Sequence, residues 1–267
     1  MSNLITDVTI GSDPELFVVI EETGEVVTAE PYIKGTKDEP FVFDINNAGF
    51  CTSLDNVMAE YTIPSVTSAK EMCSAIFHGV NFINEQLPKG LKTLAVGSAI
   101  LDEKYLQTVA AKTFGCEADF NVWLRSQNPR PDAKNKQLRT AGGHIHIGYA
   151  NPTMDLNEKL VKACDIYLGL ESILLDNDDR RREMYGKAGC FRFPKHGIEY
   201  RVLSNFWIKS TELVEWAFNG AMNAVQFVNN EQEISDEEGL LIQRAINESD
   251  KKLAEELIKK YQLQLVA

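Results

Sequence analysis

Two of the four histidines stand two residues apart in the segment Arg139–Tyr149, a spacing that suits a metal or phosphate site on a strand. Successive side chains of a β-strand point to opposite faces. His144 and His146 therefore share one face of a predicted strand, and Ile145 and Ile147 share the other. Two glycines directly before the pair indicate close backbone approach or an unusual φ. The segment predicts one ligand-bearing face and one packing face; two structural histidines are the alternative.

Acidic residues lie in three further strand-like segments. Asp13 and Glu15 flank a proline, which indicates a bulge or the start of a strand, although Asp-Pro-Glu alone is more typical of a turn. Glu60 interrupts an otherwise strand-like run, and Glu199 stands two residues before Arg201. If these segments converge on the histidines, repulsion between the carboxylates requires protonation or bound cations. Carboxylate oxygens with imidazole nitrogens suit Mg²⁺ or Mn²⁺.

One dense basic stretch stands out in a chain whose formal net charge is −12. It consists of Arg180, Arg181, Arg182, Lys187 and Arg192. A solvated loop paired with its own aspartates is the plain interpretation. An anion clamp is the functional one, because guanidinium groups match phosphate oxygens bidentately. Metal ions and clamping arginines are recurring parts of phosphoryl transfer, although the chain has no P-loop, no G-x-G-x-x-G and no nucleophile elbow.

The composition narrows the class of protein. No apolar run is long enough to span a bilayer, and the N-terminus lacks the features of a signal peptide. Five widely spaced cysteines without C-x-x-C argue against a disulfide framework and a zinc cluster. We therefore expect a cytoplasmic protein. The acidic charge argues against binding of long nucleic acid, which needs a basic footprint, but it allows a nucleotide at one local basic spot.

The predicted elements can position these residues on one surface. Strand-like segments lie at Val8–Glu21, Leu54–Pro64, Gly197–Leu203 and around the histidines; helices are predicted at Ser68–Leu87, Asp155–Asp176 and Thr211–Val228, with two more beginning near Ser235 and Ser249. Capping boxes mark the starts at 68, 155 and 235. We expect an α+β fold: a mostly antiparallel sheet with helices packed on one face and a site on the other. Residues 1–267 are expected to form a single domain, with about 208–267 as its helical C-terminal part. Residues 115–123 and 126–136 are predicted loops, the second a candidate lid.

In their order along the chain, these motifs resemble those of the carboxylate–amine ligases related to glutamine synthetase and glutamate–cysteine ligase. They resemble more closely those of the phage-encoded, phiEco32-like group. The resemblance rests on Gly11–Phe17, the Glu60 strand, Gly142–Gly148 and Glu199–Trp207, with Gly115–Asp119 and the Arg180–Arg192 loop in addition. It covers roughly the part from Thr9 to Trp207.

The family implies a glutamine synthetase-like catalytic domain with a curved sheet and an ATP-dependent reaction. A carboxylate attacks the γ-phosphate of ATP to form an acyl phosphate, and an amine displaces phosphate to give an amide. The implied substrates are a small-molecule carboxylate and amine, with Mg²⁺ or Mn²⁺ as the metal. A phage-encoded enzyme would work in the host cytoplasm, and the oligomeric state is left open.

The resemblance also implies roles for single residues. The implied metal ligands are Asp13, Glu15, Glu60, His144 and Glu199, with the shorter Asp13 at a position that is often Glu. The implied ATP-phosphate contacts are His146 and the catalytic cations Arg201, Arg192 and Lys187. The implied cationic partners of the substrate carboxylate are Arg180, Arg181 and Arg182.

Two other functions would use the same residues differently. A metal-dependent hydrolase of amides or phosphate esters would need the acids and histidines, and a non-catalytic nucleotide-binding module would need only the fold. The arginine loop favours the ligase over a hydrolase of neutral amides, which would not need it.

Overall fold

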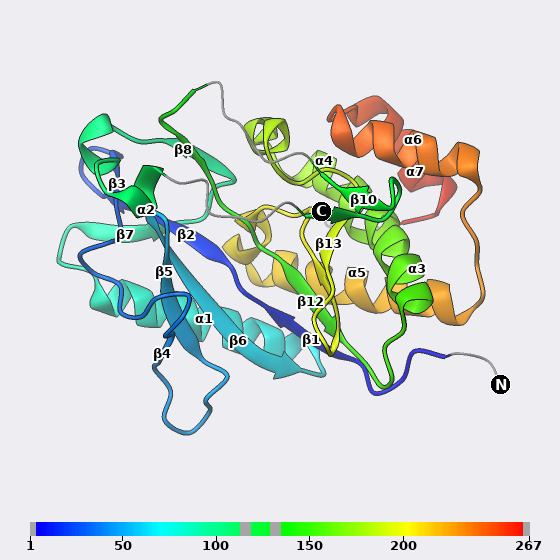
Figure 1. The fold of residues 1–267 in the computed structure, drawn as a ribbon, viewed down its shortest axis with the longest axis horizontal. Helices are drawn as coiled ribbons and strands as arrows, with labels where there is room; N and C mark the ends of the chain where they lie inside the picture. Colours follow the sequence, from blue (N-terminus) through cyan, green and yellow to red (C-terminus); the bar gives the residue numbers. More distant parts are fainter. Residues whose placement is uncertain (1–3, 113–118, 129–134, 264–267) are drawn as a thin grey trace.

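Strands from distant parts of the chain join in one large sheet, in a computed structural model that describes residues 4–112, 119–128 and 135–263 (Figure 1). The strands are β1 (Thr9–Ser12), β2 (Glu15–Ile20), β3 (Val26–Val27), β4 (Phe41–Val42), β5 (Cys51–Asp55), β6 (Met58–Val66), β7 (Leu91–Leu94), β8 (Ser98–Ile100), β9 (Phe120–Asn121), β10 (Ser126–Gln127), β11 (Leu138–Thr140), β12 (Ile145–Gly148), β13 (Cys190–Arg192) and β14 (Gly197–Tyr200). The sheet follows the order β10, β9, β13, β14, β12, β1, β6, β2, β3, with β5 on β6, β4 on β5 and β7 on β2, while β8 and β11 form a separate pair. Every strand pair of these described residues is antiparallel. The predicted α+β class with a mostly antiparallel sheet is confirmed.

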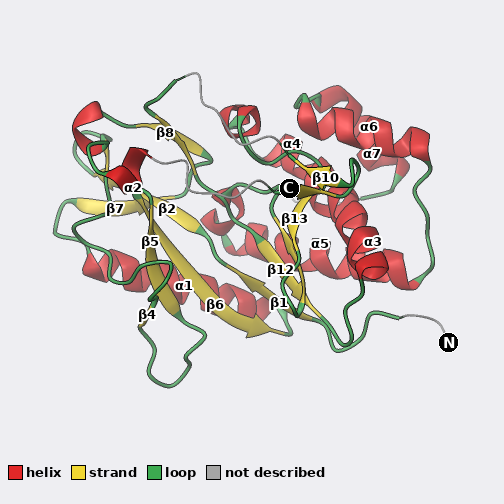
Figure 2. Ribbon diagram, in the orientation of Figure 1, coloured by secondary structure: helices red, strands yellow, loops and turns green. Residues whose placement is uncertain are grey.

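Helices pack against this sheet (Figure 2). Their bounds are α1 (Ala69–Gln86), α2 (Val109–Lys112), α3 (Met154–Cys164), α4 (Glu171–Leu175), α5 (Thr211–Asn229), α6 (Asp236–Asn247) and α7 (Lys251–Lys260). α1 packs on β6, and α5 packs against both α1 and α3, so that α1 and α5 lie behind the strands in Figure 1. No helix in the described part of the chain is long and apolar enough to cross a membrane.

The apolar face of the histidine strand lies in the core. Ile145 and Ile147 of β12 are fully buried, as are Tyr200 and Val202 at β14. All four belong to the hydrophobic cluster that the buried faces of α1, α3 and α5 complete. The two-faced strands predicted from alternation are therefore confirmed.

Two of the three predicted capping boxes are present. Ser68 and Ser235 cap α1 and α6, each in a complete capping box with the glutamate three residues later. At α7 the cap is Asp250 rather than the predicted Ser249, because the Asp250 carboxylate accepts a hydrogen bond from the backbone N–H of Leu253.

The predicted helix 155–176 differs from the structure in two ways. It begins one residue earlier and is capped by Thr153, whose hydroxyl accepts a hydrogen bond from the Leu156 N–H. It is also interrupted by a π-helical turn, Asp165–Leu170, between α3 and α4. Such turns are rare in helices and often lie near functional sites.

The predicted strand 54–64 is a hairpin. β5 ends at Asp55, Asn56 adopts a φ of 58°, and β6 begins at Met58. Asn tolerates this left-handed conformation because its short polar side chain can hydrogen-bond locally. The hairpin places β5 beside β6, so that Asp55 lies near the strand that carries Glu60.

Two predicted loops lie partly outside the described residues. In the segment 115–123, residues 115–118 are not described, and Phe120–Asn121 form β9 instead of a loop. In the candidate lid 126–136, Ser126–Gln127 form β10, and residues 129–134 are not described.

Candidate active site

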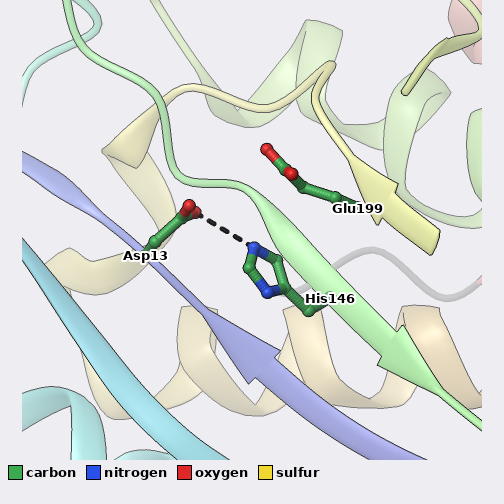
Figure 3. Close-up of side chains that lie close together, drawn as sticks. All are labelled: Asp13, His146 and Glu199. Atoms are coloured by element: carbon green, nitrogen blue, oxygen red, sulfur yellow. Dashed lines mark ion pairs between the residues drawn. The ribbon is translucent and has the colours of Figure 1, made fainter. Parts of the chain in front are cut away.

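Three adjacent strands carry most of the polar residues of the site. β12 lies between β1 and β14, with His146 opposite Gly11 on one side and opposite Glu199 on the other. Directly opposed residues of antiparallel strands project from the same face, and His144 joins this face two residues before His146. Asp13 follows the end of β1. Figure 3 shows Asp13, His146 and Glu199 pointing toward one another.

Pro14 separates β1 from β2, so that Asp13 lies between the two strands. β1 stops at Ser12 and β2 begins at Glu15, because a proline cannot donate a ladder hydrogen bond. The pairing of β1 with β6 is irregular just before this break. The predicted bulge or strand start is therefore confirmed.

Asp13, His146 and Glu199, here termed the inner group, fit a metal ion. One ligand atom from each lies within 4.8 Å of the other two. Nε2 of His146 lies 3.3 Å from Oδ1 of Asp13, but it is not aligned for a hydrogen bond and has no hydrogen-bond partner among the described residues. Carboxylate oxygens and an imidazole nitrogen are donors that suit Mn²⁺ and Mg²⁺. The donor set and an imidazole nitrogen that faces Asp13 without a hydrogen bond both fit a divalent cation.

Opposite charges stabilise the inner group. Burial would raise the pKa of Asp13, but His146 and His144 together hold it well below the ordinary value. Burial would lower the pKa of His146, but the Asp13 carboxylate raises it. Burial would likewise raise the pKa of Glu199, but His144 and Arg201 lower it. Both carboxylates are therefore ionised at neutral pH and available as ligands.

His144 is held more tightly than His146. Its Nδ1 lies 3.1 Å from Oδ1 of Asp13 and 3.2 Å from Nη1 of Arg201. Burial and the Arg201 charge lower the pKa of His144, so the ring is neutral at pH 7. A neutral imidazole has one donor and one acceptor nitrogen, so its tautomer decides which neighbour Nδ1 bonds.

Arg201 anchors the inner group from within the protein. Its Nε donates to Oδ1 of Asp119 at 2.7 Å, and its Nη1 donates to Oε1 of Glu199. Arg201 and Asp119 are both buried. The resemblance implies an ATP-phosphate contact for Arg201, whereas in the structure two of its nitrogens donate to carboxylates of the protein.

Glu15, Asp55 and Glu60, here termed the outer group, lie on the neighbouring strands. Glu15 and Glu60 are directly opposed on β2 and β6, and Oε2 of Glu15 accepts a hydrogen bond from the Gly142 N–H at 2.6 Å. Burial and Asp55 raise the pKa of Glu15 to about 8. Burial, Asp13 and Glu15 raise the pKa of Glu60 well above its ordinary value. A bound cation would reverse these shifts by supplying the missing positive charge.

The two glycines before the histidine strand are required by close packing. A Cβ atom on Gly142 would overlap the ring of His144. A Cβ atom on Gly143 would lie 2.6 Å from Nε1 of Trp207 and 2.7 Å from the carbonyl oxygen of Ser204. Neither glycine has a positive φ. Of the two predicted reasons, close backbone approach is the correct one.

Two arginines of the predicted basic loop lie at the site. Nη1 of Arg192 lies 3.6 Å from Oε1 of Glu199, and the Arg192 side chain is 42% exposed. Arg181 is buried, donates to the backbone carbonyls of Arg201 and Val202, and lines the cavity of the site. Only Arg192 therefore combines closeness to the inner group with access to solvent.

Three other cations of this loop point elsewhere. Arg180 pairs with the aspartate two residues before it, Arg182 donates to the hydroxyl of Ser172, and Lys187 donates to the carbonyl of Asn247 at the end of α6. The run of arginines forms a 3₁₀ turn, in which consecutive side chains point about 120° apart. For this reason the loop does not present its cations together as one clamp, and among the described residues neither Arg182 nor Lys187 forms an ion pair with Asp13 or Glu199.

A small cavity of about 40 Å³ opens between the outer group and Arg201. Its lining includes Glu15, Asp55, Asp119, Arg181 and Arg201. The walls thus carry both signs of charge, and the volume suits an ion or one or two water molecules.

Asp55 and Asp119 are site residues that the sequence does not single out. Asp119 ends a motif of the resemblance, but its pairing with Arg201 joins residues 82 positions apart, which no local pattern reveals. Asp55 depends on the hairpin at Asn56. The Asp-Asn pair was the available signal for that turn.

The family model of phage phiEco32-like COOH.NH2 ligase-type 2 proteins matches residues 134–267. The chain belongs to this family. The matched range contains His144, His146, Glu199 and Arg201, whereas Asp13 and the outer group lie before it. The family inferred from the motifs is confirmed. The extent differs from the expected part from Thr9 to Trp207, because the match begins at residue 134 and includes the helical C-terminal part.

One solved structure has the same kind of fold: the bifunctional glutathione synthetase from Pasteurella multocida is 14% identical, with a TM-score of 0.53, over 96% of this chain and 44% of that one. A novel glutamine synthase homolog also matches, at 11% identity and with a TM-score of 0.35, over 95% of this chain and 65% of the other. The chain thus spans less than half of the glutathione synthetase. No curated protein matches the sequence.

Proposed function

We propose that the chain is an ATP-dependent carboxylate–amine ligase that forms an amide bond through an acyl phosphate. One observation carries the proposal. The inner group and the outer group lie side by side on one face of the sheet, next to the exposed guanidinium of Arg192, in a member of a carboxylate–amine ligase family.

The inner group and the outer group are proposed to hold divalent cations, Mg²⁺ or Mn²⁺. Such cations neutralise phosphate oxygens and polarise the phosphoryl group. His146 is the nitrogen ligand of the inner group, because its Nε2 faces Asp13 without a hydrogen bond. His144 is proposed to orient Asp13 instead. The raised pKa values of Glu15 and Glu60 support a cation in the outer group.

The arginines near these groups have different proposed roles. Arg192 contacts the phosphates of ATP, since a partly exposed guanidinium beside the inner group can bind their oxygens. Arg201 positions Glu199 and His144. Arg181, in the wall of the cavity, is the member of the arginine run that can face a substrate carboxylate.

The proposed reaction has two steps. An oxygen of the substrate carboxylate attacks the γ-phosphorus, the bond to the β–γ bridging oxygen breaks, and ADP leaves. The nitrogen of the amine then attacks the acyl carbon, phosphate leaves with the acyl oxygen, and the amine releases a proton to solvent. Fixed cations such as Arg192 stabilise the charge that develops on the transferred oxygens.

The whole chain is proposed to act as one catalytic domain of residues 1–267, with about 208–267 as its helical part. One continuous hydrophobic cluster supports this, because it includes Ile10 of β1, Ile145 of β12, Ala221 of α5 and Leu257 of α7.

Metal-dependent binding of nucleotide tests the proposal. We expect isothermal titration with a non-hydrolysable ATP analogue to show binding only when Mg²⁺ is present. Glu199→Gln should abolish this binding, and Arg192→Gln should weaken it about tenfold, as expected for the loss of a charge-assisted hydrogen bond. Lys187→Gln is the matched control, because Lys187 bonds to Asn247 away from the inner group.

The same titration separates the alternatives. Metal binding without nucleotide binding under any condition would favour the metal-dependent hydrolase. If Arg192→Gln and Lys187→Gln lost equal amounts of affinity for the ATP analogue, the assignment of Arg192 to the phosphates would be contradicted.

A further inference from the structure

The loop before β4 is fixed against β5 by its backbone. Gly35 has a φ of 87°, and a Cβ atom there would lie 2.5 Å from the backbone nitrogen of Phe41. The carbonyl of Gly35 accepts from the Leu54 N–H at 3.1 Å, and the carbonyl of Lys34 accepts from the Thr52 hydroxyl at 3.1 Å. The loop therefore has a defined position over the strand that carries Asp55.

This loop directs one lysine at the outer group. Nζ of Lys37 lies 2.8 Å from Oδ2 of Asp55. The Asp55 side chain is only 10% exposed, whereas that of Lys37 is 47% exposed. Lys37 thus reaches from solvent to a nearly buried carboxylate, and its positive charge also acts on Glu15 and Glu60.

The geometry of the strands brings the three carboxylates of the outer group together. β6 lies between β5 and β2, and Glu60 is opposite Ser53 on one side and opposite Glu15 on the other. Asp55 shares the face of Ser53, because it lies two residues further along β5. One ammonium group offers a single positive charge to these carboxylates, whereas a divalent cation offers two at shorter range.

We propose that Asp55 is a ligand of the outer cation and that Lys37 is a tethered counter-ion, which the bound cation displaces from Asp55. The inference rests on the metal-binding part of the proposed function. It adds a residue to the site and gives the loop at 34–40 a role in metal binding, since the fixed loop backbone holds Lys37 within reach of Asp55.

Binding of Mn²⁺ to the full chain, followed by the electron paramagnetic resonance signal of the free ion, tests the proposal. Lys37→Gln should bind Mn²⁺ about fivefold more tightly, which corresponds to the loss of a partly exposed ion pair. Lys37→Arg keeps the charge and should bind like the unchanged protein. Lys34→Gln is the matched control on the same loop, because Nζ of Lys34 lies over the ring of Phe41, 5.1 Å from its centroid. Asp55→Asn should weaken Mn²⁺ binding.

Amine acylation of the unchanged protein gives a second readout that needs no variant. Saturation with Mn²⁺ should increase the modification of Lys37 several-fold relative to Lys34, as measured by mass spectrometry. Unchanged Mn²⁺ affinity in Lys37→Gln, or reduced modification of Lys37 with Mn²⁺, would overturn this inference and leave the proposed metal sites standing. Absence of Mn²⁺ binding by the unchanged protein would overturn both.

Discussion

At the scale of single residues, the two histidines of β12 differ although both lie on the same face. His144 is enclosed by Asp13 and Arg201, whereas His146 is partly exposed and its Nε2 has no hydrogen bond to the part of the chain that the structure describes. The i, i+2 spacing predicts the shared face. It cannot predict which ring is held by the protein and which is the proposed ligand, because this depends on Arg201, which lies 57 positions later in the chain than His144.

His146→Ala should weaken binding of Mn²⁺ to the inner group at least about tenfold, because a ligand contributes no less than the supporting residues around a metal site. His196→Ala is the control, since its exposed ring lies 6.0 Å from that of His146 but outside the inner group. Titration of each variant with Mn²⁺ measures the effect. Similar affinities of the two variants would remove His146 from the proposed ligands.

Asp119→Asn should lower the free energy of unfolding by about 2 kcal/mol, because the buried Arg201 loses the charge that its Nε faces. Urea unfolding measures the loss. Asp155→Asn provides the comparison, as its ion pair with Lys159 is exposed and should contribute less than about 1 kcal/mol. Equal effects of the two substitutions would show that Asp119 does not anchor Arg201.

At the scale of elements, local patterns predict those segments whose determinants lie within them. α1 and α6 are predicted with their caps because each capping box is a contact between residues three positions apart. The π-helical turn is not predicted, because it is coupled to distant partners. In this turn Asp165 accepts hydrogen bonds from Nε1 of Trp123 at 2.6 Å and from the hydroxyl of Tyr200 at 2.8 Å.

Asp165 should make stability depend on pH in the acidic range. Burial raises its pKa to about 6 despite the hydrogen bonds from Trp123 and Tyr200, whereas an unfolded aspartate titrates near 3.9. The protonated form is thus favoured in the folded state. The raised pKa of Asp165 therefore contributes fully to the free energy of unfolding below about pH 4, and this contribution is lost as the pH rises through about 6.

Urea unfolding of Asp165→Asn across this range tests the expectation. The neutral amide does not ionise, so the stability of this variant relative to the unchanged protein should rise between pH 4 and 7, by up to about 3 kcal/mol. A difference that is independent of pH would show that Asp165 is ionised in the folded protein throughout.

At the scale of the whole molecule, the order of strands decides which carboxylates meet. The sequence predicts that Asp13, Glu15, Glu60 and Glu199 share one face, and the resemblance names them as ligands. The sequence does not predict that these residues divide into an inner group and an outer group. This division follows from the placement of β1 beside β12 and of β2 beside β6. The sequence also does not predict the dispersal of the arginine run, because this follows from the 3₁₀ turn at Asp179–Glu183.

The charge of the whole molecule also bears on the site. With a formal net charge of −12, the protein repels a triphosphate at long range. In the proposed function, attraction comes from cations held by the two groups of carboxylates and from nearby arginines such as Arg192, within about one Debye length, roughly 10 Å at moderate salt.

Carboxylate-dependent formation of ADP tests the central claim most directly. The full chain would be incubated with ATP, Mg²⁺ and a set of small carboxylic acids, with hydroxylamine as the amine that captures an acyl phosphate as a hydroxamate. The proposed ligase should produce ADP and hydroxamate in equal amounts, only when a carboxylate is present, and neither product should form with Glu199→Gln. Formation of ADP at the same rate without a carboxylate, and without hydroxamate in any reaction, would contradict the account and indicate hydrolysis.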